Sequence, residues 1–371
     1  MQSSLKNLFI IGVVLLFASC SGSGQKQLGT DFTPSFTVEE TQRFGKNDSI
    51  SISAISNILI TGDGLSLVTD GRAPAIYVFD QNGDFIGNVG DVGTDPGQFD
   101  TPPVISLFEN DSLLAFDRSL SRASIFHREG NLWVFNRFFE VATQLTDGYA
   151  IQALVKLEGL DGYVTTEQSM MDPSNPESLT MPIRYRIIDE QGQSIQDAYI
   201  QRKPQELVID NSAGVPMIKV LPFGRNSFLR VEKGGDYYLG AWNDKLSIQY
   251  VSVKGEQIGG IELEVAERTI TDDDKLLDPR SADPALTGKL PTTHPAYVSF
   301  LVSDKGNYWI NLGQIDAEST YWVVVDPNST VLGSTLLPAT TRPVRIIDGK
   351  LYAANQGSRT EPEVVVLKVD F

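Results

Sequence analysis

Residues 67–87 are LVTDGRAPAIYVFDQNGDFIG, and the same arrangement returns at residues 113–130 as LLAFDRSLSRASIFHREG. Each copy has a short apolar strand that ends in aspartate, a polar loop, a second apolar strand and a turn that contains glycine. Between the copies, GDVGTDPGQF at residues 90–99 contains three glycines and a proline, which interrupt a strand. We interpret residues 67–130 as two small antiparallel sheets joined by a connection.

A polar turn that precedes a strand recurs along the chain, at residues 63, 110, 147, 234, 305 and 348. The successive spacings are 47, 37, 87, 71 and 43 residues, which indicates a unit of about 40 residues with insertions in the third and fourth intervals. That length is typical of a four-stranded propeller blade. Beyond the N-terminal segment the apolar pattern has a period of two, not 3.6. The sequence therefore predicts an all-β, six-bladed β-propeller with four-stranded antiparallel blades.

The last unit, residues 345–371, is too short for a full blade. Residues 32–44 precede the first complete unit and include the strand-like run Ser35-Phe36-Thr37-Val38. We expect this N-terminal strand to complete the last blade, because closing the ring covers the open sheet edges.

The first residues have the features of a bacterial export signal. Lys6 supplies a positive charge, and the apolar run from Leu8 to Ala18 is too short to span a bilayer as a stable helix. The run ends Leu15-Leu16-Phe17-Ala18-Ser19-Cys20, which resembles the lipobox of bacterial lipoproteins, where the cysteine receives diacylglycerol. The alternative is an ordinary signal peptide followed by an incidental thiol.

We therefore interpret residues 1–19 as a lipoprotein signal peptide, Cys20 as the site of lipid attachment, residues 20–31 as a flexible tether and residues 32–371 as the propeller. Cys20 is the only cysteine, so no disulfide can form within one chain. The lipobox predicts an extracytoplasmic, membrane-anchored protein. Serine rather than an acidic residue at position 21 favours the outer membrane of a Gram-negative bacterium by analogy.

The formal net charge of −17 and the isoelectric point near 4.5 limit the kinds of binding partner that the protein can have. An acidic surface repels nucleic acid and anionic lipid headgroups. We expect contact with the membrane only through the N-terminal lipid, and no nucleic-acid partner.

Few residues are candidates for catalysis or metal binding. Histidine occurs only at His127 and His294, which excludes a centre of three imidazoles. His127 borders a hairpin turn, where a structural role is expected. His294 belongs to a long connection, residues 266–295, and we predict it at the mouth of the ring as a ligand-binding candidate.

Acidic residues have simpler explanations than catalysis. The run Thr271-Asp272-Asp273-Asp274-Lys275 lacks the alternating spacing of a calcium loop and is interpreted as a solvated loop, with an aspartate capping a short helical turn. Asp70, Asp80 and Asp117 end or border strands, and we expect their carboxylates to accept hydrogen bonds from the following turns.

Three arginines, Arg72, Arg118 and Arg122, lie in the loops that follow Asp70 and Asp117. Loops at matching positions of neighbouring blades open on one face of a propeller, so these arginines are candidates for binding an anionic ligand. Salt bridges between blades are the alternative.

The chain resembles bacterial six-bladed β-propeller lipoproteins related to NHL and TolB-like propellers. The resemblance is carried by Ile76-Tyr77-Val78-Phe79-Asp80 and by a phrase that those proteins have as Gly-x-Gly-Pro-Gly-Glu-Phe. Here the phrase is Gly93-Thr94-Asp95-Pro96-Gly97-Gln98-Phe99, with Gln98 in place of glutamate. A later run at residues 304–310, with Trp322-Val323-Val324-Val325-Asp326, also resembles a blade of that group. The resemblance implies the fold and the cell envelope, and no particular reaction.

These observations favour a ligand-binding or protein-binding module of the cell envelope over an enzyme. We expect its working face to carry Arg72, Arg118, a polar insertion at residues 158–182 and the connection at residues 266–295. No cofactor is expected. The alternative is a metal-dependent, lactonase-like propeller hydrolase or lyase with a divalent ion on the axis. Such sites leave no local sequence motif, so the sequence does not exclude an axial calcium ion.

Overall fold

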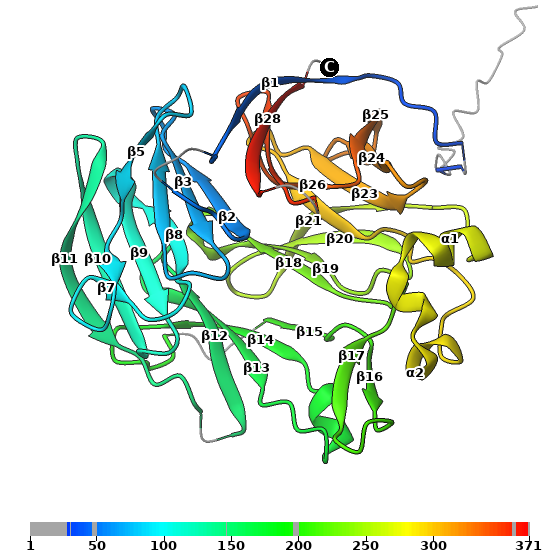
Figure 1. Cartoon of the computed structure of the whole chain (residues 1–371), viewed down its shortest axis with the longest axis horizontal. Coiled ribbons are helices and arrows are strands. Elements are labelled where there is room, and N and C mark those ends of the chain that lie inside the picture. Colours follow the sequence, from blue (N-terminus) through cyan, green and yellow to red (C-terminus); the bar gives the residue numbers. More distant parts are fainter. Residues whose placement is uncertain are drawn as a thin grey trace, which may run out of the picture.

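The computed structural model describes residues 28–29, 31–46, 50–145, 147–195, 200–357 and 361–369. Within them, six antiparallel sheets of four strands surround a common axis (Figure 1). The prediction of an all-β, six-bladed propeller is therefore confirmed. The signal peptide and Cys20 lie outside the described residues.

The first three blades follow each other closely in the chain. Blade 1 contains β2 (Ile55–Ile60), β3 (Ser66–Asp70), β4 (Ile76–Phe79) and β5 (Phe85–Asn88). Blade 2 contains β8 (Val104–Phe108), β9 (Ser112–Asp117), β10 (Arg122–Glu129) and β11 (Leu132–Glu140), with the 3-10 turn η1 (Glu109–Asp111). Blade 3 contains β12 (Tyr149–Val155), β13 (Tyr163–Ser169), β14 (Ile183–Ile188) and β15 (Ile200–Arg202), with η2 (Pro176–Leu179).

The other blades are built in the same way. Blade 4 contains β18 (Phe228–Val231), β19 (Tyr237–Gly240), β20 (Leu246–Val251) and β21 (Gln257–Leu263), with η3 (Lys233–Gly235). Blade 5 contains β22 (Ser299–Val302), β23 (Tyr308–Gln314), β24 (Ser319–Val325) and β25 (Val331–Pro338). Blade 6 contains β26 (Thr341–Ile347), β27 (Lys350–Asn355), β28 (Glu363–Val369) and β1 (Val38–Phe44).

Blade 6 is completed by the N-terminal strand, as the sequence predicted. β1 pairs antiparallel with β28, from Val38 opposite Val369 to Phe44 opposite Val364. Figure 1 shows the two strands side by side at the junction of the ring. The ring is therefore closed by hydrogen bonds between segments from the two ends of the chain.

Burial on both sides explains the composition of the central strands. Each residue of β3 is buried, whereas the outer strand β11 has mostly exposed residues. Apolar clusters lie between neighbouring blades; Leu67 and Phe126, for example, share one cluster between blades 1 and 2. Stacked sheets need apolar side chains on both faces, which gives continuous apolar runs in the inner strands instead of strict alternation.

Residues 90–99 form the predicted connection between blades 1 and 2. Two short strands, β6 (Asp91–Val92) and β7 (Gln98–Phe99), pair in parallel. Gly90 has a φ of 67°, and a Cβ atom there would lie 2.4 Å from the carbonyl oxygen of Gly97. Only glycine fits this turn without displacing the backbone.

Two insertions lie in the intervals that the spacing predicted. The hairpin of β16 (Leu207–Asp210) and β17 (Met217–Val220) precedes blade 4. A helical segment with α1 (Asp272–Leu277), η4 (Pro279–Ala282) and α2 (Pro284–Thr287) precedes blade 5. The expectation of one insertion at residues 158–182 is partly wrong: β13 runs through this range, so residues 158–162 and 170–182 belong to two separate connections.

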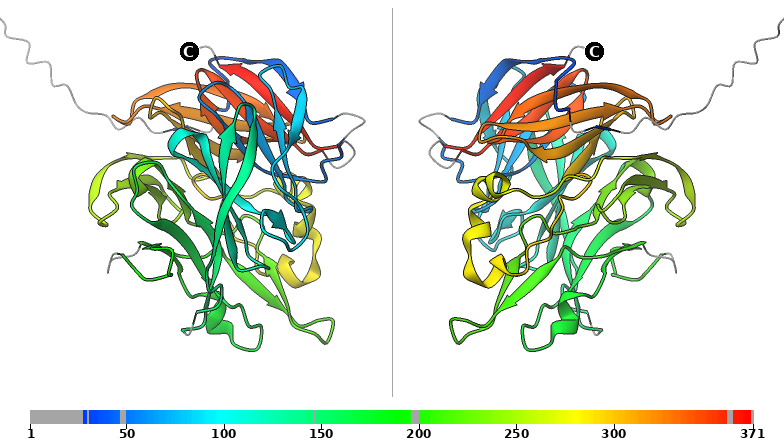
Figure 2. Two further views of the ribbon diagram at one scale, coloured as in Figure 1. Left: turned by 90° about the vertical axis from the view of Figure 1, so that its left-hand side faces the viewer. Right: turned by 90° about the vertical axis from the view of Figure 1, so that its right-hand side faces the viewer.

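Both insertions lie on one face of the ring, which we call the insertion face. In a four-stranded antiparallel blade, the connection to the next blade and the connection between the second and third strands lie at the same end. Figure 2 shows the β16–β17 hairpin and the helical segment on the same side. No helix in the described part of the chain is long and apolar enough to cross a membrane.

Candidate functional site

The structure gives the three candidate arginines different environments. Arg72 is exposed on the β3–β4 connection. Arg118 is also exposed, and its guanidinium donates a hydrogen bond to the side-chain oxygen of Gln152, in the first strand of blade 3. For both residues, ligand binding stays a prediction.

Arg122 has a structural role in the connection at residues 90–99. Its side chain is only 8% exposed. The guanidinium donates to the carbonyl oxygens of Thr94, Asp95 and Gln98 at 2.8–3.0 Å. Arg122 therefore holds this segment against blade 2 instead of facing an open binding surface.

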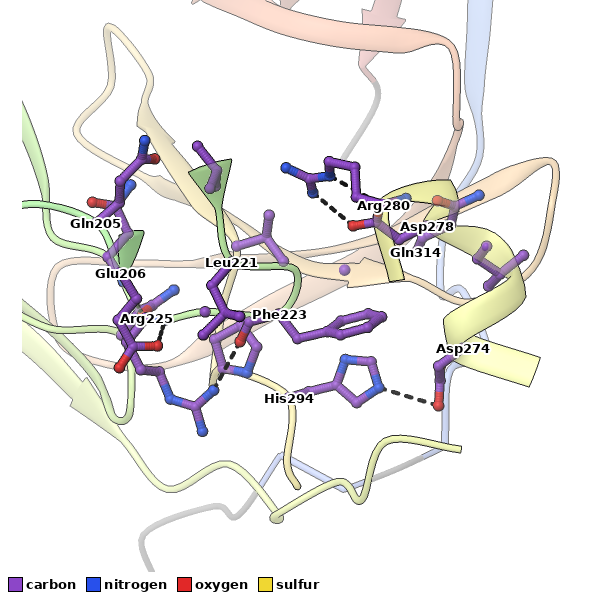
Figure 3. Close-up of a pocket in the computed structure, with 18 of the residues that line it drawn as sticks. Gln205, Glu206, Leu221, Phe223, Arg225, Asp274, Asp278, Arg280, His294 and Gln314 are labelled. Atoms are coloured by element: carbon purple, nitrogen blue, oxygen red, sulfur yellow. Dashed lines mark hydrogen bonds and ion pairs between the residues drawn. The ribbon is translucent and has the colours of Figure 1, made fainter. Parts of the chain in front are cut away.

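A pocket lined by residues of both insertions opens on the insertion face. It has a volume of about 290 Å³, close to the lower end of the range for small-molecule sites. The end of β17 and the loop after it form one wall, and α1 and η4 form the opposite wall (Figure 3). Its lining also includes Phe228, the first residue of β18, and Val298, which directly precedes β22.

A lysine joins the two insertions that form the walls. The Lys219 ammonium lies 2.6 Å from Asp210 in the hairpin and 2.6 Å from Asp283 at the start of α2. The ammonium lowers the pKa of both carboxyls, so the bridge is ionised at neutral pH.

The pocket lining combines apolar side chains with a few polar groups. The apolar members are Val220, Leu221, Phe223, Phe228, Leu277, Pro295 and Val298. The charged members are Glu206, Arg225, Arg268, Asp274, Asp278 and Arg280. This combination is typical of sites for a small molecule that has an apolar body and one polar end.

The carboxylates of the pocket accept hydrogen bonds from nearby residues. Glu206 accepts from the backbone N–H of Arg225 at 2.7 Å. Asp274 accepts from the backbone and hydroxyl of Thr271, the N-cap of α1. Asp278 accepts from the Arg280 guanidinium at 2.6 and 2.9 Å.

The cations of the pocket differ in their partners. The Arg225 guanidinium donates to Phe223 and Thr293, and that of Arg280 pairs with Asp278. The Arg268 guanidinium has no hydrogen bond or ion pair within 4 Å among the described residues; it lies over the ring of Phe32, 5.4 Å from the centroid. Burial lowers the pKa of Arg268, although Asp274 acts in the opposite direction. Arg268 is thus a partly desolvated cation without a paired anion.

His294 lines this pocket. Its Nε2 atom lies 3.2 Å from an oxygen of Asp274, without the alignment of a good hydrogen bond, and its ring packs edge-on against Phe223 (Figure 3). Burial and the charges of Arg268 and Arg225 lower the pKa of His294 despite Asp274. The imidazole is therefore neutral at pH 7. Its role in binding stays a prediction.

The acidic run at residues 271–275 forms the start of α1. Thr271 is the N-cap and makes reciprocal hydrogen bonds with Asp274, so the predicted capped turn is present, although threonine and not aspartate is the capping residue. Among the described residues, no group of three or more His, Cys, Asp or Glu side chains is arranged to hold a metal ion.

Sequence reasoning did not identify Arg268, Arg225 or Phe223. The one available signal was the excess length of the third and fourth intervals, which contain all three residues. Arg268 is distinguished only by the absence of an ion-pair partner among the described residues. This environment forms only when both insertions fold, so the sequence alone does not show it.

Comparisons with known proteins agree with this architecture. A family model, DUF5128, described as a 6-bladed beta-propeller, matches residues 45–135, which cover blade 1 and most of blade 2. A search of curated proteins finds no match.

Several solved structures are similar over most of the chain. A protein described as exported, from Bacteroides fragilis NCTC 9343, is 10% identical, with 93% of this chain and 99% of that chain covered and a TM-score of 0.55. A member of the duf4221 family from Bacteroides vulgatus ATCC 8482 is 10% identical (89% and 97% covered, TM-score 0.47). Virginiamycin B lyase from Staphylococcus aureus is 9% identical (90% and 99% covered, TM-score 0.45). At 10% identity, the likeness to the exported protein extends to the fold alone.

Proposed function

We propose that this chain is a lipid-anchored binding propeller of the cell envelope, and that its insertion-face pocket takes a small ligand with an apolar body and a carboxylate. The observation that carries the proposal is the Arg268 guanidinium, which has no ion pair with any described residue and lies in a pocket whose carboxylates already accept hydrogen bonds. A bound carboxylate would supply the missing anion.

Energetics favour an anionic ligand at this position. A partly desolvated cation without a partner costs free energy, and a charge-assisted hydrogen bond contributes about 1.5–3 kcal/mol. The apolar lining removes the rest of the ligand from water. The location in the envelope is supported by the lipobox at Cys20.

The test compares small acids with their neutral analogues. Calorimetry would measure binding of N-acetyl-phenylalanine and 4-methylpentanoate, and of the corresponding amides, to the wild type and to Arg268→Gln. We expect the wild type to prefer the acids. The variant should bind them at least tenfold more weakly, while its affinity for the amides changes little.

Stability separates a binding role from a structural one. Because Arg268 makes no ion pair within the described residues, we expect Arg268→Gln to melt at the same temperature as the wild type or higher. Equal affinity for acids and amides, unchanged affinity in the variant, or no saturable binding at millimolar concentration would contradict the proposal.

A further inference from the structure

A second charged site lies on the axis of the ring. The first strands of neighbouring blades contact one another, as β18 contacts β22 and β22 contacts β26, so these strands are the innermost ones. Three arginines belong to them: Arg230 in β18, and Arg342 and Arg345 in β26. All three side chains are exposed to solvent. An exposed side chain on a strand enclosed by the ring faces the axial channel.

Two of these arginines reach toward the neighbouring blades. The Nε of Arg230 donates to the carbonyl oxygen of Phe300, in the first strand of blade 5, at 3.3 Å. Arg342 donates to the carbonyl oxygen of Ile55, in the first strand of blade 1, at 2.6 Å. These contacts hold the two guanidinium groups at the inner wall and leave other N–H donors of each group available.

The charges in the channel are unbalanced. The blades around the channel partly desolvate these exposed guanidinium groups, which lowers the pKa of Arg230 and of Arg342; repulsion from Arg342 lowers that of Arg230 further. Among the described residues, the Glu232 carboxylate interacts with these arginines. Burial raises the pKa of Glu232, whereas the charges of Arg345 and Arg230 act in the opposite direction. Among the described residues, none of the three arginines forms an ion pair within 4 Å.

We propose that the axial channel binds a small oxyanion with two negative charges, such as phosphate or sulfate, between Arg230 and Arg342. Guanidinium groups match the geometry of such oxyanions through paired N–H donors. The anion would replace repulsion between two cations by attraction to both. The whole chain carries a formal net charge of −17, so the cationic channel differs from the acidic remainder of the protein in attracting an anion. This site shares no side chain with the lining of the insertion-face pocket.

Calorimetry and thermal unfolding in phosphate and sulfate test the proposal, with sodium chloride at matched ionic strength as the reference. We expect saturable binding of both oxyanions to the wild type and a higher melting temperature than in chloride. Arg230→Gln should weaken binding at least tenfold, and Arg342→Gln provides a second variant if the first does not fold. Lys305→Gln removes a charge from an exposed turn and should bind like the wild type.

A phosphate monoester, glucose 1-phosphate, separates a free ion from the charged end of a larger ligand. Binding of phosphate alone supports a site for the free ion, and binding of both supports a site open to a larger ligand. The proposal is overturned if neither phosphate nor sulfate binds beyond chloride, or if folded Arg230→Gln and Arg342→Gln both bind like the wild type.

Discussion

At the residue scale, aspartates at the ends of the second strands of blades 1 and 2 fasten the segment that enters each blade to that blade. Asp117 accepts hydrogen bonds from the backbone N–H groups of Asp100, Thr101 and Leu120. Asp70 occupies the same position in blade 1 and accepts from the segment that enters its own blade and from the following turn. The sequence predicted the contact with the turn, whereas the contact with the entering segment requires the folded ring.

Asp117→Asn should destabilise the protein by about 1–3 kcal/mol, because a buried acceptor of several hydrogen bonds is replaced by a weaker one. Burial favours the neutral acid, but hydrogen bonds from Thr101, Leu120 and Asp100 outweigh it, and the pKa of Asp117 lies below its ordinary value. The carboxylate therefore contributes stability above the unfolded-state pKa of about 4, and this contribution is lost as pH falls through the folded-state pKa.

Denaturant unfolding between pH 7 and pH 3 checks this prediction. The difference between wild type and variant should shrink on acidification. Asp84→Asn, at an exposed turn, serves as the control and should show little change at either pH. A constant difference across the pH range would show that the charge of Asp117 is not the cause.

At the element scale, the two insertions add a ligand-sized pocket to the ring of six blades. Their positions could be predicted, because the spacing of turns exceeds one blade length in two intervals. Beyond the capped turn at residues 271–275, their structures could not, since neither the β16–β17 hairpin nor the rest of the helical segment has a strong local pattern. Arg122 shows the same limit: the sequence placed it in a loop, but its burial depends on where residues 90–99 fold back.

Lys219→Met should separate the walls of the pocket, because it removes the ammonium that bridges Asp210 and Asp283. We expect faster amide hydrogen exchange in both insertions and several-fold weaker binding of the small acids, with the blades unaffected. Lys305→Met is the matched control on an exposed turn of blade 5. Unchanged exchange in both insertions would show that the bridge does not hold them together.

At the scale of the whole molecule, the route of the N-terminal segment relates the pocket to the proposed anchor. Leu28, which the sequence assigned to the tether, forms a parallel bridge with Val265, just before the helical insertion. A smaller cavity nearby is lined by Phe32, Arg268 and His294. Leu28 follows Cys20 by eight positions, and a chain spans at most about 3.6 Å per residue. Lipid attachment would thus hold this side of the ring within roughly 30 Å of the membrane.

Cys20→Ser tests the anchor. We expect the wild type to fractionate with membranes and to carry a diacylglycerol mass on its N-terminal peptide, whereas the variant is released from the membrane fraction, because a single sulfur carries the lipid. Ser23→Ala, in the same segment, should behave like the wild type. Membrane association of the variant equal to that of the wild type would contradict lipid attachment at Cys20.

A crystal structure of the protein with bound N-acetyl-phenylalanine would test ligand binding at Arg268 most directly. We expect the carboxylate at about 2.7–2.9 Å from the Arg268 guanidinium, with the phenyl ring among Leu221, Phe223 and Leu277. A ligand bound elsewhere, or an Arg268 side chain turned to a carboxylate of the protein, would contradict it.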